Sequence, residues 1–199
     1  MGQVRGKAFQ DEMVANYCWG CGADNPAGLH LKSYWDGEVA VAQWTPAHEY
    51  SAGPRHILNG GTVAALLDCH GVCTAVASAY QQEQRGMETK PGIWCATAAL
   101  SIDYLRPTPI DRAFQLRAQV VAKEDRVTSV ECRGAARACS GLGGTRTERW
   151  RRPRARNVTR RRGPHNWATQ VWPHGVVSTI CDIGEHFGDR HVSDRRFGP

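Results

Sequence analysis

Residues 57–71 form the stretch ILNGGTVAALLDCHG, and the interpretation of the whole sequence depends on it. Asn59 is a residue type favoured at a helix N-cap, and two glycines follow it in the first turn. Apolar residues then continue as far as Tyr80 and would lie around much of the helix circumference. We therefore predict a long helix that is buried on more than one side and carries a single carboxylate, Asp68.

The length and composition suit one core with an appendage, because the chain has 199 residues and 41% of them are hydrophobic. Residues 1–140 carry 13 Lys/Arg against 14 Asp/Glu, whereas residues 141–199 carry 12 against 5, so all the excess charge lies in the C-terminal part. No apolar run approaches the roughly 20 residues of a membrane span, and the N-terminus lacks the apolar segment of a secretory signal. We expect a soluble, cytoplasmic protein.

Alternating residues on both sides of the helix predict an antiparallel sheet. Residues 38–44 predict a short strand, and residues 24–37 supply turns and room for another. Three longer strands are predicted after the helix, at residues 93–105, 113–122 and 127–137. Strands, one long helix and then a meander indicate an α+β fold in which the helix covers one face of the sheet.

The alternation stops at about Cys139. Residues 138–199 mix Arg, Gly, Pro and Trp without a sustained period, so we predict a disordered, arginine-rich C-terminal tail after a domain of residues 1–137. Arginines with interleaved tryptophans can bind nucleic acid or an acidic partner. A solvated tail without a binding role is the interpretation we favour, and nucleic acid would bind only through this tail.

The start of the helix and its carboxylate together suggest acyl chemistry. A helix N-terminus carries partial positive charge and unpaired amide hydrogens, and a glycine such as Gly60 lets a ligand approach them closely. Such amides would stabilise the oxyanion that forms when an ester or thioester is attacked. Asp68 can act either as a general base on water or as a nucleophile on the acyl carbon.

The spacing of these two groups makes a geometric demand. Gly60 and Asp68 are separated by about 12 Å along one helix, at 1.5 Å per residue, which is too far for both to act on the same carbonyl. A second copy of the helix, lying antiparallel to the first, would bring the Asp68 of one chain to the Gly60 of the other. We therefore expect a homodimer with two equivalent sites, and leave open whether dimers pair into tetramers.

Three stretches resemble a known family in their order and spacing. They are YCWGCGADNPAGLHL (residues 17–31), NGGTVAALLD (59–68) and LSIDYLRPTPID (100–111). Together they are similar to the hotdog-fold acyl-CoA thioesterases of the PaaI-like branch, over about residues 12–137. The resemblance implies a six-stranded antiparallel sheet wrapped around a central helix, a dimer, and hydrolysis of an acyl-CoA to free coenzyme A and a carboxylic acid.

The resemblance also implies roles for individual residues. Asp68 would activate water or attack the thioester, the Gly60 amide would polarise its carbonyl, and Thr97 would help to hold the water. Where the family usually opens its helix with His-Gly-Gly, this chain has Asn59, which can cap the helix but cannot titrate. The family's sixth strand should follow residue 137, so we expect the last strand to be missing or altered. The alternative function is therefore a non-catalytic acyl-CoA-binding or regulatory hotdog protein with a basic tail.

Two further residues are candidates for substrate binding. Gly61 lies beside Gly60 at the predicted helix start, where the absence of side chains leaves the backbone accessible. Arg106 precedes a Pro-Thr-Pro turn, and its guanidinium suits a phosphate of coenzyme A, although a surface ion pair is an equally good interpretation.

The remaining chemistry-bearing residues are assigned structural roles. Cys18 and Cys21 form CWGC, which could be half of a zinc site or a redox pair. Because no second CxxC or His pair accompanies them, we expect a packed turn, with no metal and no cofactor. His70 is expected to be a hydrogen-bonded structural histidine. The eight scattered cysteines favour reduced thiols over a disulfide framework.

Overall fold

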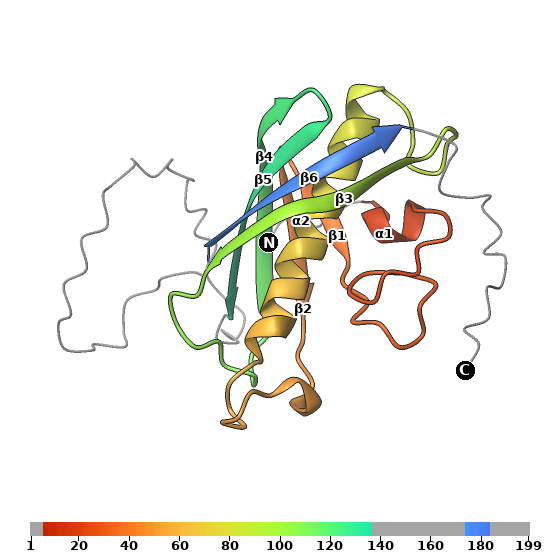
Figure 1. Cartoon of the computed structure of the whole chain (residues 1–199). Coiled ribbons are helices and arrows are strands. Elements are labelled where there is room, and N and C mark those ends of the chain that lie inside the picture. Colours follow the sequence, from red (N-terminus) through yellow and green to blue (C-terminus); the bar gives the residue numbers. More distant parts are fainter. Residues whose placement is uncertain (1–5, 137–173, 184–199) are drawn as a thin grey trace, which may run out of the picture.

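The computed structural model describes residues 6–136 and 174–183, and in it one curved antiparallel sheet wraps around a long helix, α2 (Figure 1). The six strands lie in the order β1-β2-β4-β5-β6-β3, so β1 and β3 are the two edges. This is the arrangement expected of the hotdog fold. The elements are α1 (Phe9–Glu12), β1 (Ser33–Asp36), β2 (Val39–Trp44), the 3-10 helix η1 (His48–Tyr50), α2 (Gly60–Gln82), β3 (Ile93–Asp103), β4 (Phe114–Glu124), β5 (Val127–Ala136) and β6 (His174–Ile183).

The predicted N-cap of α2 is confirmed. The side-chain oxygen of Asn59 accepts hydrogen bonds from the amides of Gly61 at 2.8 Å and Thr62 at 3.3 Å. The amide of Val63 bonds to the backbone oxygen of the same asparagine at 3.1 Å. The Asn59 side chain therefore satisfies two of the four amides that a helix start leaves without an intrahelical partner, and its backbone oxygen accepts the first helical hydrogen bond.

Helix α2 is the centre of the core. Its buried residues lie on several sides, as the apolar sequence predicts, and the largest fully buried ones include Leu66, Leu67 and Val76. Within the described residues it is also the one helix long and apolar enough to cross a membrane, with a mean hydropathy of 1.4. Because 67% of that window is buried inside the fold, the apolar sequence is accounted for by the core.

The prediction that the last strand is missing was wrong, because β6 lies between β5 and β3. Val177 pairs with Val130 of β5 and Thr179 with Thr128 of the same strand, while the other edge of β6 pairs along β3. Sequence reasoning looked for this strand directly after β5, whereas residues 137–173 intervene, and such long connections are uncommon. Part of the predicted tail therefore belongs to the sheet, which extends beyond residue 137; residues 138–173 and 184–199 lie outside the described residues.

A buried polar network joins α2 to the opposite edge of the sheet. His70 is fully buried, with Nδ1 2.9 Å from Ser33 Oγ and Nε2 3.2 Å from the backbone oxygen of Ala40. Gln10 completes the network by donating to Ser33 Oγ at 3.0 Å and accepting from the Ser33 amide at 2.8 Å. The Nε2–H tautomer satisfies both ring nitrogens, so His70 has the structural role predicted for it.

We predict that His70 makes folding sensitive to acid. Burial lowers the pKa of His70 to about 4, although its hydrogen bond to the Ala40 backbone oxygen opposes this shift. The unfolded chain takes up the same proton below about 6.5. The free energy of unfolding should therefore fall as the pH drops from about 6.5 to about 4, by up to about 3 kcal/mol from this residue. Urea unfolding of the wild type and His70→Gln, each at neutral pH and near pH 4, measures this loss. Equal acid sensitivity of the two proteins would contradict the assignment.

The cap of α2 gives a second prediction. Asn59→Ala leaves the amides of Gly61 and Thr62 without their acceptor and should lower the free energy of unfolding by about 1 kcal/mol. Asn59→Asp keeps an acceptor oxygen and adds a charge that favours a helix N-terminus, so it should retain most of the stability. Chemical denaturation followed by circular dichroism compares the two variants, and an equal loss in both would show that the cap contributes nothing.

Candidate active site

Asp68 and Thr97 meet between α2 and the edge strand β3. The Thr97 hydroxyl donates to Oδ1 of Asp68 at 2.6 Å, so the threonine orients the carboxylate directly. Asp68 is half-buried, while Thr97 and its strand neighbours from Ala96 to Ser101 are exposed. Within the described residues Oδ2 of Asp68 has no hydrogen-bond partner and is available to a water or a substrate.

The start of α2 presents one unused amide. Asn59 occupies the amides of Gly61, Thr62 and Val63, whereas in the described part of the chain the amide hydrogen of Gly60 has no acceptor. Gly60 is exposed, so a ligand oxygen can reach this amide from solvent. Gly60, rather than Gly61, therefore supplies the free donor that the sequence predicted at this helix start.

Tyr104 is a site residue that sequence reasoning missed. Its hydroxyl donates to the backbone oxygen of Gly60 at 2.9 Å, and its ring passes 3.6 Å from the position that a Cβ of Gly60 would occupy. The side chain is 53% exposed and forms one wall beside the helix start. Tyr104 alternates with the apolar residues of the strand predicted at residues 93–105, and no local pattern indicates contact with a residue 44 positions away.

Gly60 and Asp68 do not meet within one chain. They lie in the same continuous helix, Gly60–Gln82, so the rise per residue still separates them by about 12 Å. The described chain thus contains a carboxylate held by Thr97 and an amide donor, each facing solvent at a different height along α2.

The two predicted substrate-binding residues lie near the helix start or beyond β3. The amide of Gly61 is taken up by Asn59, which leaves Gly61 only its lack of a side chain to offer a ligand. Arg106 is half-buried in the loop after β3 and already takes part in an interaction with the protein. Gly61 lies in the first turn of α2, whereas Arg106 lies outside the helix.

Four cysteines from two distant segments come together on a face of α2 other than the one that carries Asp68. Cys18 and Cys21 lie in the loop before β1, and their Sγ atoms are 3.6 Å from Cys69 and 3.7 Å from Cys73 of the helix, respectively. The second cysteine pair that sequence reasoning found lacking is therefore Cys69-x₃-Cys73, whose spacing by four residues on one helix was the missed signal.

The state of the cysteines agrees only in part with the expected reduced thiols. Five of the described cysteines carry free thiols: Cys18, Cys21, Cys69, Cys73 and Cys132. Cys95 of β3 is disulfide-bonded, which corrects the expectation at that position.

Comparisons with known proteins place the fold. Residues 56–137 match the family model of the thioesterase superfamily. A Haemophilus influenzae thioesterase structure is 11% identical with a TM-score of 0.51, over 79% of this chain and 83% of that one. A thioesterase superfamily protein from Shewanella loihica is 26% identical (TM-score 0.47; 75% and 89% covered), and the E. coli PaaI protein of the phenylacetic acid degradation operon is 13% identical (TM-score 0.49; 76% and 79% covered).

None of the curated proteins matches this chain. The matched residues 56–137 contain α2, β3, β4 and β5, and with them Asp68, Thr97 and the helix start. The sheet order and the enclosed helix agree with the fold of the Haemophilus protein. Residues 56–137 are thus similar to the thioesterase superfamily, and the sheet order with its enclosed helix gives the chain a hotdog fold.

Proposed function

We propose that this protein hydrolyses an acyl-CoA thioester to free coenzyme A and a carboxylic acid. The observation that carries the proposal is that one helix presents two groups: the Asp68 carboxylate, which Thr97 orients, and the free, exposed amide of Gly60 at the helix start. The match of residues 56–137 to the thioesterase superfamily supports thioester cleavage in general. The PaaI-like motifs of the sequence support coenzyme A as the thiol part of the substrate.

The active unit in this proposal is a homodimer. Because Gly60 and Asp68 lie about 12 Å apart along α2, one complete site needs the carboxylate of one chain and the amide of the other. The edge strand β3 offers a surface for a second copy, since one edge of it is unpaired in the sheet order. Leu100, Tyr104 and Leu105 are 37%, 53% and 47% exposed along or just after this strand, an apolar edge that a partner would cover.

Helix α2 supports the same interface. Ala64, Asp68 and Val72 are half-buried and four residues apart, so they form one stripe along the helix. An antiparallel partner helix packed on this stripe would pass its own helix start close to Asp68. Two equivalent sites would then lie across a two-fold axis.

The reaction follows from the geometry of such a site. Acting as a general base, Asp68 takes a proton from water through Oδ2 while Thr97 holds Oδ1, and the hydroxide adds to the thioester carbonyl carbon. The partner's Gly60 amide donates to the resulting oxyanion. When the C–S bond breaks, the coenzyme A sulfur leaves with the electron pair and receives the proton from Asp68. Direct attack by the carboxylate, giving an anhydride that water then hydrolyses, uses the same groups.

Other predicted residues act around this centre. Asn59 keeps the Gly60 amide free by occupying its neighbours, and so serves as a positioning residue at the helix start. Gly61 would leave room for the thioester beside the backbone. Arg106, half-buried after β3, is proposed to contact a phosphate of coenzyme A near the same end of the helix.

Removing the base tests the proposal. Asp68→Asn retains an oxygen that can accept from Thr97 but cannot take a proton, and it should lower turnover of acyl-CoAs by about 100- to 10,000-fold. Thr97→Val removes only the orienting hydroxyl and should cause a smaller loss. Chromatography of released coenzyme A measures turnover without a thiol reagent, which would also react with the exposed Cys18. Saturable acyl-CoA binding without turnover in the wild type would favour the non-catalytic alternative.

Removing the amide tests the oxyanion donor. Gly60→Pro deletes the amide hydrogen at a position where proline is well tolerated, because it is the first residue of α2. Asn59 before it is already extended (φ −61°, ψ 133°), as a residue preceding proline should be. We expect about a 100- to 1,000-fold loss of turnover. Gly60→Ala is the matched control, because it keeps the amide and places its Cβ in ordinary contact with Tyr104.

Mixing the two inactive variants tests whether the site is shared between chains. A heterodimer of Asp68→Asn with Gly60→Pro contains one site with both groups intact and one with neither. With random pairing, the mixture should regain about one quarter of the wild-type activity per chain. A mixture that stays inactive, or a wild type that is monomeric by sedimentation while it hydrolyses acyl-CoA, would refute the shared site.

A further inference from the structure

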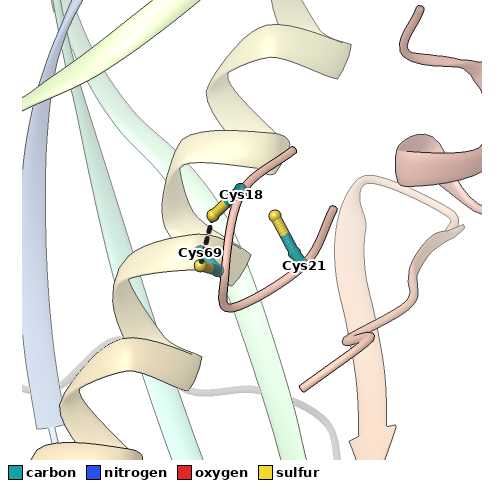
Figure 2. Close-up of side chains that lie close together, drawn as sticks. All are labelled: Cys18, Cys21 and Cys69. Atoms are coloured by element: carbon teal, nitrogen blue, oxygen red, sulfur yellow. Dashed lines mark hydrogen bonds between the residues drawn. The ribbon is translucent and has the colours of Figure 1, made fainter. Parts of the chain in front are cut away.

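Four cysteine sulfurs converge where the N-terminal loop crosses α2. Figure 2 shows Cys18 and Cys21 on the loop facing Cys69 on the helix, and the Sγ atoms of these three lie within 4.8 Å of one another. The Sγ of Cys73, one turn further along α2, lies 3.7 Å from that of Cys21. Two segments about fifty residues apart in the sequence therefore contribute two thiols each to one cluster.

The spacing of the sulfurs fits a single metal ion. In a tetrahedral site with Zn–S bonds of about 2.3 Å, neighbouring sulfurs stand about 3.8 Å apart. The Cys18–Cys69 and Cys21–Cys73 distances of 3.6 and 3.7 Å are close to this value. They are far longer than the S–S bond of about 2.0 Å in a disulfide, and all four thiols are free.

The loop is shaped to deliver both of its cysteines. The amide of Gly22 donates to the backbone oxygen of Cys18 at 2.7 Å, which closes a tight turn and leaves the two thiols on the same side. The side chain of Asn16 accepts from the Cys18 amide at 3.2 Å and steadies the start of this turn. A Cβ on Gly22 would lie 2.4 Å from the backbone oxygen of Asn16, so only glycine fits there.

The loop also has to approach the helix very closely. A Cβ on Gly20 would lie 2.3 Å from the Sγ of Cys69, so the absence of a side chain at this position admits the helix cysteine to the cluster. Cys69 and Cys73 are four residues apart and therefore lie on the same face of α2. Gly22 is thus required by the turn itself, whereas Gly20 is explained by the approach of the helix thiol.

The surroundings favour an all-cysteine site. Cys21, Cys69 and Cys73 are buried, while Cys18 is exposed and leaves a route by which an ion can enter. His70, between the two helix cysteines, is already bonded to Ser33 and Ala40 on another face.

We propose that Cys18, Cys21, Cys69 and Cys73 bind one zinc ion, which ties the N-terminal loop to α2. Each thiol gives up its proton on binding, and the four Zn–S bonds complete the tetrahedron. With four protein ligands and no open position, the ion is structural and does not bind water or substrate. Cys73 lies outside the group of three within 4.8 Å and joins the set through Cys21, whose Sγ is 3.7 Å from its own.

Zinc reconstitution of the full chain tests the proposal. The protein is reduced without oxygen, stripped with a chelator, mixed with excess zinc and dialysed, and its metal content is measured by plasma mass spectrometry. We expect about one zinc per chain and a higher unfolding temperature than in the stripped protein. Fully reduced, folded protein that retains no zinc would overturn the proposal. Disulfide formation by these thiols in air would not change that conclusion.

Single variants identify the ligands. Cys18→Ser, Cys69→Ser and Cys73→Ser should each reduce retained zinc severalfold or more, and an unchanged zinc content in any of them would remove that residue from the ligand set and overturn the four-cysteine site. Cys132→Ser is the matched control, because Cys132 is an equally buried free thiol on β5 outside the cluster and should leave the zinc content unchanged.

Cobalt substitution gives a readout that does not depend on the stability of the variants. Wild-type protein loaded with Co(II) should show the intense thiolate-to-cobalt absorption of a four-sulfur tetrahedral site. A weak octahedral spectrum would overturn the proposal. Acyl-CoA turnover is a separate measurement, so failure of zinc binding and failure of hydrolysis can be told apart.

Discussion

The enclosure of α2 is the constraint on which the rest of the structure depends. A helix that is apolar on almost all sides cannot remain in water, and a single sheet face covers only part of it. The sheet therefore curves around the helix, and the N-terminal loop covers a further side (Figure 1). The single residue that starts this helix, Asn59, determines where each later side chain points, because it fixes the beginning of a continuous run to Gln82.

Three consecutive residues show how tightly the helix is surrounded. Successive side chains on a helix point about 100° apart, so Asp68, Cys69 and His70 face three different directions. Asp68 faces Thr97 of β3, Cys69 faces the loop cysteine Cys18, and His70 faces the buried network at β1 and β2. The triplet Asp-Cys-His in the middle of an apolar sequence is thus not an interruption of the core, since each of the three side chains meets a partner from another element.

Much of the fold could be predicted from the sequence because the signals were local. The N-cap at Asn59, the length of the apolar helix and the alternation of the later strands all depend on neighbouring residues, and each appears where it was expected. β6 was missed because its place in the sheet depends on pairing with β3 and β5 across residues 137–173, which no local pattern encodes. Similarly, the contact of Tyr104 with Gly60 and the cysteine cluster each join segments that are far apart in the sequence. The residues can be seen in the sequence, but the contacts between them cannot.

The proposed catalytic site and the proposed zinc site both use side chains of α2, so both depend on the orientation of this helix. Asp68 can serve a site completed by a second chain only if α2 keeps its rotation about its own axis, since a small turn would move the carboxylate away from Thr97. The loop that carries Cys18 contacts the very next residue, Cys69, and the network around His70 holds the residue after that. Restraints on two adjacent faces of the helix oppose rotation in either direction. A zinc ion at the cysteines would therefore stabilise the orientation of Asp68 without touching the substrate, which is how a structural metal can support catalysis from another face of the same helix.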